Sequence, residues 1–280
     1  MQFKNKQLDL SRAHVMGILN VTPDSFSDGG RFTTVEAALS QARRLVGEGA
    51  SIIDIGGEST RPGAQPVSVQ QELARVVPVV AGIASELDVI ISIDTSKAEV
   101  MREAVTAGAH MINDVLALRE PNALATAAEL QVPVCLMHMQ GEPRTMQTRP
   151  MYQDVVGDIR DFLQERVQAC LAAGIPTSRV MLDPGFGFGK TLQHNLTLFK
   201  HLPEFSQLGY PLLVGVSRKS MIGSILDMPV EQRLYGSLGL ASLAVWLGAS
   251  IIRAHDVAAT VQAIRTVEAV RSIQEDDNGA

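Results

Sequence analysis

The stretch TVEAALSQARRLVGEGASIIDIGG, residues 34–57, holds one complete unit of the pattern that decides the fold. Its first part, up to Ala50, is amphipathic, with apolar residues returning at helical spacing, which predicts a helix. The run SIIDIGG that follows is short and rich in β-branched residues, which predicts a buried strand. The unit is therefore interpreted as a helix followed by a strand.

The same alternation continues along the chain. Longer amphipathic stretches such as DIRDFLQERVQACLAAG (158–174) separate short apolar runs. The eight strand candidates are 15–21, 51–57, 89–95, 110–116, 132–138, 179–185, 211–217 and 250–256. Eight strands, each followed by a helix, in 280 residues predict an α/β protein with a single (β/α)8 TIM barrel. A doubly wound open sheet is the weaker alternative, since no dinucleotide fingerprint is complete.

The domain organisation follows from the absence of a Pro/Gly/Ser-rich linker. Residues 1–280 are expected to form one domain, with a short N-terminal β-hairpin over the bottom of the barrel. The polar tail, about 274–280, is expected to fray. Because no internal sequence repeat is seen, the repetition is one of structure only.

Composition and charge exclude several classes of protein. The net charge of −6 gives no general attraction to nucleic acid or to anionic membranes, so an anionic substrate must meet locally placed cations. The N-terminal stretch has no apolar core of signal-peptide length, and no run approaches a membrane span. Cys135 and Cys170 lie at apolar positions and are expected to be buried and reduced. A cytoplasmic location is expected.

Three long irregular stretches follow strands and are predicted to lie at the C-terminal face of the barrel, where this fold carries its active site. They are TPDSFSDGGRF (22–32), ESTRPGAQPVS (58–68) and MQGEPRTMQTRPM (139–151).

Strand alternation sorts the polar residues, because residues two apart share a face. The apolar set is expected to face the helices, so the polar set points into the barrel near its upper end. That set is Asn20, Asp54, Glu58, Ser92, Asp94, Asn113, Asp183, Ser217, Lys219, Arg253 and His255. Buried polar groups need partners or a ligand. Asp54 lies deeper and is expected to pair within a network, whereas a shared ligand explains the set as a whole. Asp114 breaks the alternation and is assigned to the following turn.

LDPGFGFGK (182–190) completes neither a P-loop nor a dinucleotide fingerprint, because Pro184 and Lys190 stand where those motifs need glycine. Its glycines are expected to keep the loop behind Asp183 thin, so that a flat ligand can approach the backbone. Phe186 and Phe188 are candidates to offer a ring to that ligand, although loop packing explains Phe188 equally well.

The inward residues indicate what is bound. Asp94, Asn113 and Asp183 suit a planar nitrogen heterocycle with amino and lactam groups. A second set suits an anion such as diphosphate or carboxylate, and consists of Thr60, Arg61, Lys219, Arg253 and His255. Asn20 offers an amide oxygen to Mg²⁺. An inward lysine such as Lys219 also allows a Schiff base. His138 is interpreted as a hydrogen-bonded wall residue rather than a metal ligand.

The motifs resemble those of the dihydropteroate synthases of the folate pathway. GILNVTPDSFSDGG (17–30) and GASIIDIGGESTRPG (49–63) resemble the family's two long signatures. Six shorter motifs follow in the family's order and cover nearly all of the chain: ISIDTSKAEV, INDV, MHMQGEPRTMQ, LDPGFGFGK, GVSRKSMIG and IIRAHDV.

The resemblance implies an enzyme that joins 6-hydroxymethyl-7,8-dihydropterin diphosphate to 4-aminobenzoate and releases diphosphate. It implies Mg²⁺ held by Asn20 and a homodimer. The implied pterin diphosphate-binding residues are Thr60, Asp94, Asn113, Asp183, Lys219, Arg253, Ala254 and His255. The implied aminobenzoate-binding residues are Phe26, Arg61, Pro62, Phe188, Ser217 and Lys219. The implied catalytic residues are Asp28, Arg61, Lys219 and Arg253.

The implied mechanism is charge stabilisation of the departing diphosphate rather than covalent catalysis. An electron-rich dihydropterin allows an SN1-like path, in which Asp28 offsets the cationic methylene and closing loops exclude water. Three alternatives stay open: a pterin-dependent methyltransferase barrel, a pterin-binding paralogue without chemistry, and a Schiff-base lyase using Lys219.

Overall fold

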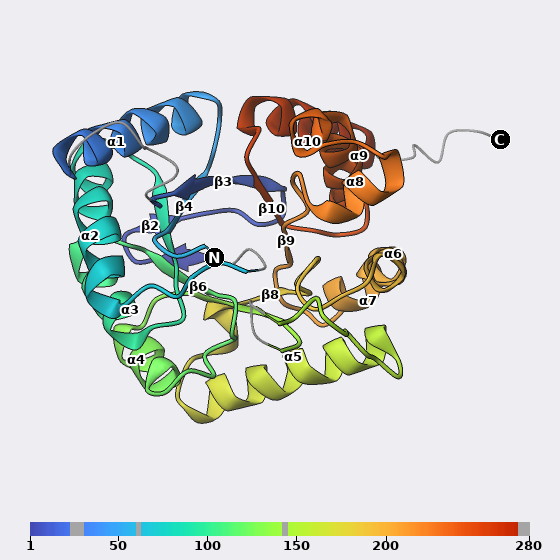
Figure 1. The fold of residues 1–280 in the computed structure, drawn as a ribbon, viewed down its shortest axis with the longest axis horizontal. Coiled ribbons are helices and arrows are strands. Elements are labelled where there is room, and N and C mark those ends of the chain that lie inside the picture. Colours follow the sequence, from blue (N-terminus) through green and yellow to red (C-terminus); the bar gives the residue numbers. More distant parts are fainter. Residues whose placement is uncertain (23–30, 60–62, 142–144, 274–280) are drawn as a thin grey trace.

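The computed structural model describes residues 1–22, 31–59, 63–141 and 145–273. Eight parallel strands follow the order β8-β7-β6-β5-β4-β3-β10-β9, and a bridge between Leu182 and Leu212 brings the two ends of this sheet together. Helices surround the strands (Figure 1). The predicted (β/α)8 barrel is therefore confirmed.

The strands fall within the eight predicted runs, except that the first barrel strand begins one residue earlier, at His14. They are β3 (His14–Asn20), β4 (Ile52–Gly56), β5 (Ile90–Asp94), β6 (Met111–Asp114), β7 (Val134–Met137), β8 (Val180–Asp183), β9 (Leu213–Val214) and β10 (Ile251–Ala254). The prediction was too long for β9, which was expected over 211–217. Only Leu213 and Val214 pair with β10, and the chain then leaves the ladder towards the barrel mouth.

Ten α-helices occur in the described part of the chain. They are α1 (Arg31–Gly47), α2 (Val69–Glu86), α3 (Ala98–Ala107), α4 (Ala123–Leu130), α5 (Val155–Ala172), α6 (Leu192–Lys200), α7 (Leu202–Ser206), α8 (Ser220–Leu226), α9 (Leu234–Trp246) and α10 (Val257–Arg271). Two strands, β8 and β9, are each followed by two helices, where the repeat predicted one.

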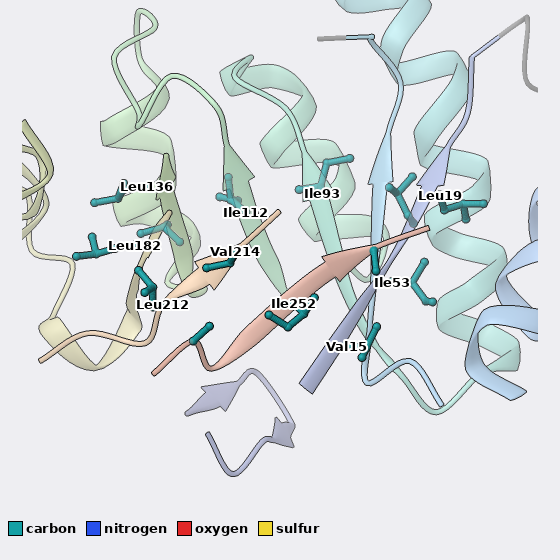
Figure 2. Packing of buried hydrophobic residues seen from close by; sticks show 14 of the residues in the cluster. Val15, Leu19, Ile53, Ile93, Ile112, Leu136, Leu182, Leu212, Val214 and Ile252 are labelled. Carbon is teal, nitrogen blue, oxygen red and sulfur yellow. The ribbon is translucent and has the colours of Figure 1, made fainter. Parts of the chain in front are cut away.

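The outer face of the strands forms the larger apolar core with the helices. Ten of its side chains are labelled in Figure 2, among them Val15 on β3, Ile93 on β5 and Ile252 on β10. Each fully buried aliphatic side chain of this kind contributes about 1.5–3 kcal/mol. This outer layer is the apolar half of the predicted alternation.

The inner face begins with an apolar floor, to which each of the eight strands contributes one side chain. These are Met16, Ile52, Ile90, Met111, Cys135, Met181, Leu213 and Ile251. The predicted N-terminal hairpin, β1 (Gln2–Phe3) and β2 (Lys6–Gln7), is antiparallel and places the fully buried Phe3 against this floor. The floor closes the barrel at the bottom, so polar chemistry is confined to the layers above it.

Helix capping fixes the chain where it leaves the barrel mouth. Thr191 caps α6, because its hydroxyl accepts a hydrogen bond from the backbone N–H of His194, whose side chain accepts in return from the Thr191 N–H. This capping box follows directly after the glycine-rich loop and anchors the end of that loop. Ser68 and Gln71 form a second capping box at the start of α2.

Both cysteines are buried and unpaired, as predicted. Within the described ranges, no helix combines the length and the apolar character that a membrane crossing requires.

Candidate active site

The predicted inward residues meet in one hydrogen-bonded network above the apolar floor. Arg253 on β10 donates from Nε to Asp54 Oδ2 at 2.6 Å and from Nη2 to Asp94 Oδ2 at 2.8 Å. Asn113 on β6 donates from Nδ2 to the same oxygen of Asp54 at 3.2 Å. Four strands thus contribute to a single cluster, and the expectation that Asp54 lies in a pairing network is confirmed.

Burial and neighbouring charges shift the pKa values of the ionisable groups in this network. Burial, followed by the negative charge of Asp54, raises the pKa of Asp94 to about 7, and the positive charge of Arg253 offsets only part of this rise. Burial acts to lower the pKa of Arg253, but the carboxylates of Asp54 and Asp94 outweigh it and raise that pKa. The guanidinium therefore stays charged, and the protonation of Asp94 is open to change near neutral pH.

Two polar atoms of the same layer have no partner among the described residues. They are Oδ1 of Asp54 and Oγ of Ser92, both fully buried. The two residues are direct neighbours in the register of β4 and β5. Because buried polar atoms are nearly always satisfied, a ligand or ordered water is expected to reach this layer.

Asp183 ends β8 and begins the glycine-rich loop. Its Oδ1 accepts a hydrogen bond from the backbone N–H of Gly185 at 2.7 Å. Burial raises the pKa of this carboxyl, and the positive charge of Lys219 opposes the rise. The buried carboxyl faces the barrel interior as predicted.

Lys219 and Phe188 form the second part of the site. The Lys219 ammonium donates to the carbonyl of Phe186 and lies 4.5 Å from the centroid of the Phe188 ring. This is a cation–π contact. Burial lowers the pKa of Lys219 to about 8, although the charge of Asp183 acts to raise it. The site therefore offers a cation held against one face of an aromatic ring.

The two phenylalanines of the loop have different positions. Phe186 is fully buried in the outer core, where its ring packs against Phe199 at a centroid distance of 5.2 Å. The prediction that Phe186 offers its ring to a ligand was wrong, because the ring faces away from the barrel interior. Phe188 is only partly buried and remains the aromatic residue of the site.

The loop glycines allow close packing against neighbouring groups of the protein. Gly185 has a φ of 72°, and a Cβ atom there would lie 1.9 Å from the carbonyl oxygen of His138. At Gly189 a Cβ atom would lie 2.4 Å from the carbonyl oxygen of Gln140. Any larger residue would separate this loop from the loop after β7. The loop is thin, as expected, and the close approach that its glycines allow is to the loop after β7.

An apolar wall that the sequence reasoning missed borders Phe188. It is formed by Val115, Met137, Met139 and Met146, with Leu116 and Phe188 packed against it. Its members come from the end of β7 and from the segments after β6 and β7, and their spacing along the chain gives no period that reveals them. Such a wall suits a flat ligand.

Ser217 and His255 join the segments that follow β9 and β10. The Ser217 hydroxyl lies 3.0 Å from Nδ1 of His255 and accepts from the His255 backbone N–H at 3.2 Å. Next to them, Arg218 donates to both carboxylate oxygens of Asp256, at 2.9 and 2.5 Å. Ala254 turns its methyl group into the outer core, so only its backbone is left for a role at the mouth.

Asn20 ends β3 at the mouth. A Cβ atom at Gly56 would lie 3.6 Å from Asn20 Oδ1 and 3.7 Å from Asp94 Oδ2, so glycine leaves a space between these two oxygens. Mg²⁺ commonly uses one or two protein oxygens and completes its shell with substrate phosphates and water. The donor set fits that pattern. The described residues contain no cluster of three or more acidic, histidine or cysteine ligands.

Five predicted site residues lie outside the described ranges: Phe26, Asp28, Thr60, Arg61 and Pro62.

Asp114, assigned above to a turn, is the last residue of β6, but its carboxylate does organise that turn. It accepts from the backbone N–H groups of Leu116 and Leu118 at 2.8 and 2.7 Å. The predicted wall residue His138 is buried and bonded to Lys190.

Comparison with known proteins agrees with this geometry. The family described as pterin binding enzyme matches residues 16–255. Dihydropteroate synthase of Haemophilus influenzae is 57% identical over 265 residues, covering 95% of this chain and 96% of that protein. The Escherichia coli (strain K12) dihydropteroate synthase is 56% identical over 268 residues, covering 96% of this chain and 95% of that protein.

Solved structures give the same result. The Yersinia pestis dihydropteroate synthase in a sulfonamide drug complex superposes with a TM-score of 0.93 at 55% identity, covering 98% of this chain and 99% of that one. The Xanthomonas albilineans dihydropteroate synthase with 4-aminobenzoic acid has a TM-score of 0.90 at 52% identity, covering 95% and 96% of the two chains.

The barrel and its polar mouth thus define a pterin binding enzyme. Within that class, the chain belongs to the dihydropteroate synthase family, the transferases of folate biosynthesis. The resemblance that the motifs indicated is confirmed.

Proposed function

We propose that this chain joins 6-hydroxymethyl-7,8-dihydropterin diphosphate to 4-aminobenzoate, giving 7,8-dihydropteroate and diphosphate. The observation that carries the proposal is the division of the barrel mouth into two adjoining parts. One part is the buried network of Asp54, Asp94 and Arg253, and the other is the Lys219–Phe188 cation–aromatic pair.

The pterin is assigned to the first part. Asp94, Asn113 and Asp183 offer amide and carboxyl groups in fixed directions, which suits the amino-pyrimidine edge of the heterocycle. Two unpartnered buried atoms, Asp54 Oδ1 and Ser92 Oγ, support a ligand at this depth. Asp54 is added to the predicted pterin set, since it lies in the same network.

The aminobenzoate is assigned to the second part. Its ring is expected to stack on Phe188 and the apolar wall beside it, and its carboxylate to meet Ser217 and Lys219. The related Xanthomonas albilineans enzyme with 4-aminobenzoic acid supports this choice of substrate. The proposed aminobenzoate-binding set keeps three further residues, Phe26, Arg61 and Pro62.

The diphosphate is assigned to Arg253 and His255, with Thr60 and the Ala254 backbone beside them. Asn20 is the proposed protein ligand of Mg²⁺, with Asp94 Oδ2 at the edge of the same space. The ion, when bound, would neutralise charge on the departing diphosphate. Arg253 would stabilise the same negative charge, and its guanidinium stays protonated at any working pH.

The reaction proceeds by an SN1-like displacement. The bond between the pterin methylene carbon and the diphosphate oxygen breaks, and the electron pair leaves with diphosphate. The amine of aminobenzoate then donates its lone pair to the methylene carbon, and the proton that it loses passes to the released diphosphate. Because this amine is already nucleophilic, the Phe188 and Lys219 contacts serve to orient it. Asp28 is proposed to offset the cationic methylene.

A homodimer is proposed for the assembled enzyme. Large apolar side chains are exposed together in the region of α8 and α9, which suits a contact with a second copy. They are Ile225, Leu226, Met228, Val230, Tyr235, Leu243 and Trp246. Sedimentation of the purified chain tests the assembly, since a monomer at assay concentration would contradict it.

The test of the function is a diphosphate-release assay with dihydropterin diphosphate and Mg²⁺, with and without 4-aminobenzoate. Release matched by dihydropteroate formation is expected. A chelator is expected to slow both, which tests the metal separately. Tight pterin binding without either product would contradict the proposal and would favour the pterin-binding paralogue or the methyltransferase.

A further inference from the structure

Lys190, the last residue of the glycine-rich motif, is a buried lysine to which the proposed reaction gives no role. It is 3% exposed, and its ammonium bonds no carboxylate in the described part of the chain, although the charge of Asp183 acts to raise its pKa. Its ammonium donates instead to the carbonyls of Gly185 at 2.7 Å and Phe188 at 3.0 Å, and lies 3.0 Å from Nδ1 of His138. An ammonium has three N–H donors, and these three acceptors use all of them.

The contacts of Lys190 join two loops. Gly185 and Phe188 belong to the loop after β8, whereas His138 begins the loop after β7. His138 is itself fixed, because its backbone N–H donates to the Asp183 carbonyl at 3.0 Å and its ring packs edge-on against Phe162 at 5.0 Å. Lys190 therefore ties the glycine-rich loop to the start of the neighbouring loop, at a residue that is itself bonded to β8.

The same loop carries the two groups that Lys219 contacts. The Phe186 carbonyl accepts from the Lys219 ammonium, and the Phe188 ring lies under it. Lys190 binds the carbonyl of Phe188 itself and that of Gly185, which directly precedes Phe186. Lys190 thus fixes the conformation of the loop whose Phe186 carbonyl and Phe188 ring contact Lys219.

Burial of a charge without a carboxylate partner is unfavourable, so the position is a poor choice for stability alone. Burial also lowers the pKa of Lys190 well below its ordinary value. Residues that break a local rule in this way are concentrated at functional sites.

We propose that Lys190 is a positioning residue that holds the loop after β8 in the conformation presenting Phe188 and the Phe186 carbonyl to Lys219. It acts mainly on the aminobenzoate part of the site, because the larger part of the pterin network, Asp54, Asp94, Asn113 and Arg253, lies on strands that Lys190 does not contact. This inference rests on the proposed function, because it names the substrate whose binding depends on the loop.

Lys190→Met tests the proposal, since methionine keeps the length of the side chain and removes all three donors. The KM for 4-aminobenzoate is expected to rise about tenfold, while the KM for dihydropterin diphosphate changes by less than about twofold. Lys4→Met is the matched control, because Lys4 donates to the Val105 carbonyl near the floor of the barrel. Lys4→Met is expected to leave both KM values unchanged.

Hydrogen exchange of the loop backbones in the unliganded protein is the second measurement. Lys190→Met is expected to speed exchange at residues 185–189 and 138–140 and to leave the strands protected. Faster loop exchange with an unchanged KM for aminobenzoate would overturn the positioning role. A rise of both KM values by the same factor would also overturn it, because that is the result of a purely structural residue.

His138→Leu covers the case in which Lys190→Met does not fold. It removes one of the three acceptors and leaves both carbonyl bonds, so a smaller rise, confined to the KM for aminobenzoate, is expected. An unchanged KM in this variant would overturn the proposal. Absence of dihydropteroate formation by the unaltered chain would instead contradict the proposed function, so the two failures are distinguishable.

Discussion

Arg253 and Asp54 form an ion pair inside the barrel, with Nε of the arginine 2.6 Å from Oδ2 of the carboxylate. Asp54 is fully buried, and Arg253 reaches from β10 past the neighbouring strand β3 to meet it on β4. Because Nη2 of the same guanidinium binds Asp94, the two carboxylates hold the plane of the arginine in one orientation. Asp54 therefore fixes the orientation of Arg253, the residue proposed to bind diphosphate, from the side of the apolar floor.

Asp54→Asn is expected to damage both stability and activity. The substitution leaves Arg253 with one carboxylate in a buried site, and breaking such a pair costs about 3–5 kcal/mol. Urea unfolding measures the loss. Turnover is expected to fall by at least about tenfold, because the guanidinium loses its fixed orientation. Asp88→Asn is the control, since its pair with Lys6 lies on the surface; equal losses in the two variants would contradict the role of Asp54.

The free energy of unfolding is expected to fall as the pH rises towards neutral and beyond. The pKa of Asp94 is raised to about 7 in the folded protein, above the ordinary value of about 3.9 for the unfolded chain. Between these values the folded state holds the proton more firmly, so this contribution is complete below the lower pKa and is lost as the pH passes through about 7.

Urea titrations of the unliganded protein between about pH 5 and pH 8 measure this dependence. Asp94→Asn, which imitates the protonated carboxyl, is expected to reduce the slope. Some slope is expected to persist, because burial also raises the pKa values of Asp114 and Asp183. An identical slope in the variant and the parent chain would show that Asp94 does not titrate in this range.

The fold and the inward set of residues were predictable from the sequence because both depend on short periods. The two-residue repeat of a strand separates Ile53 from Asp54 and Ile252 from Arg253 without any knowledge of partners. The repeated strand–helix unit then places the strand ends at one face. The barrel and its polar mouth follow from these two rules.

The partners of these residues were not predictable, because they depend on contacts between distant segments. Arg253 and Asp54 are 199 residues apart, and alternation says only that both point inward. Phe186 and Phe188 differ because the loop turns through glycines with positive φ, which removes the strand period that would assign their sides. Nothing in the sequence indicated that Lys190 is buried, since a lysine at a loop end ordinarily reaches solvent.

Phe3→Ala separates stability from activity. The Phe3 ring lies against the apolar floor, at the opposite end of the barrel from the proposed site. Loss of a fully buried phenylalanine is expected to lower the free energy of unfolding by about 3–5 kcal/mol. Both KM values are expected to stay unchanged at a temperature where the variant is folded. A selective change in either KM would indicate that the floor is coupled to the mouth.

Arg218 and Asp256 are expected to act as a unit in aligning the two segments that carry Lys219 and His255. Arg218 has a φ of 57°, in the left-handed region, where a non-glycine residue is strained. Its backbone N–H donates to Ser237 Oγ at 2.9 Å, and its guanidinium binds both oxygens of Asp256. The ion pair is partly exposed, so its contribution to stability is small compared with its effect on geometry.

A double-mutant cycle of Arg218→Ala and Asp256→Ala measures this coupling through kcat/KM for 4-aminobenzoate. Each single variant is expected to lose about tenfold, and the double variant little more, because either change already releases the segment. Arg218→Gly is the backbone control, since it relieves the left-handed strain while removing the same side chain. An activity close to that of the parent chain in Arg218→Gly would show that strain, and not the ion pair, governs the alignment. Losses that multiply in the double variant would show that the two side chains act independently.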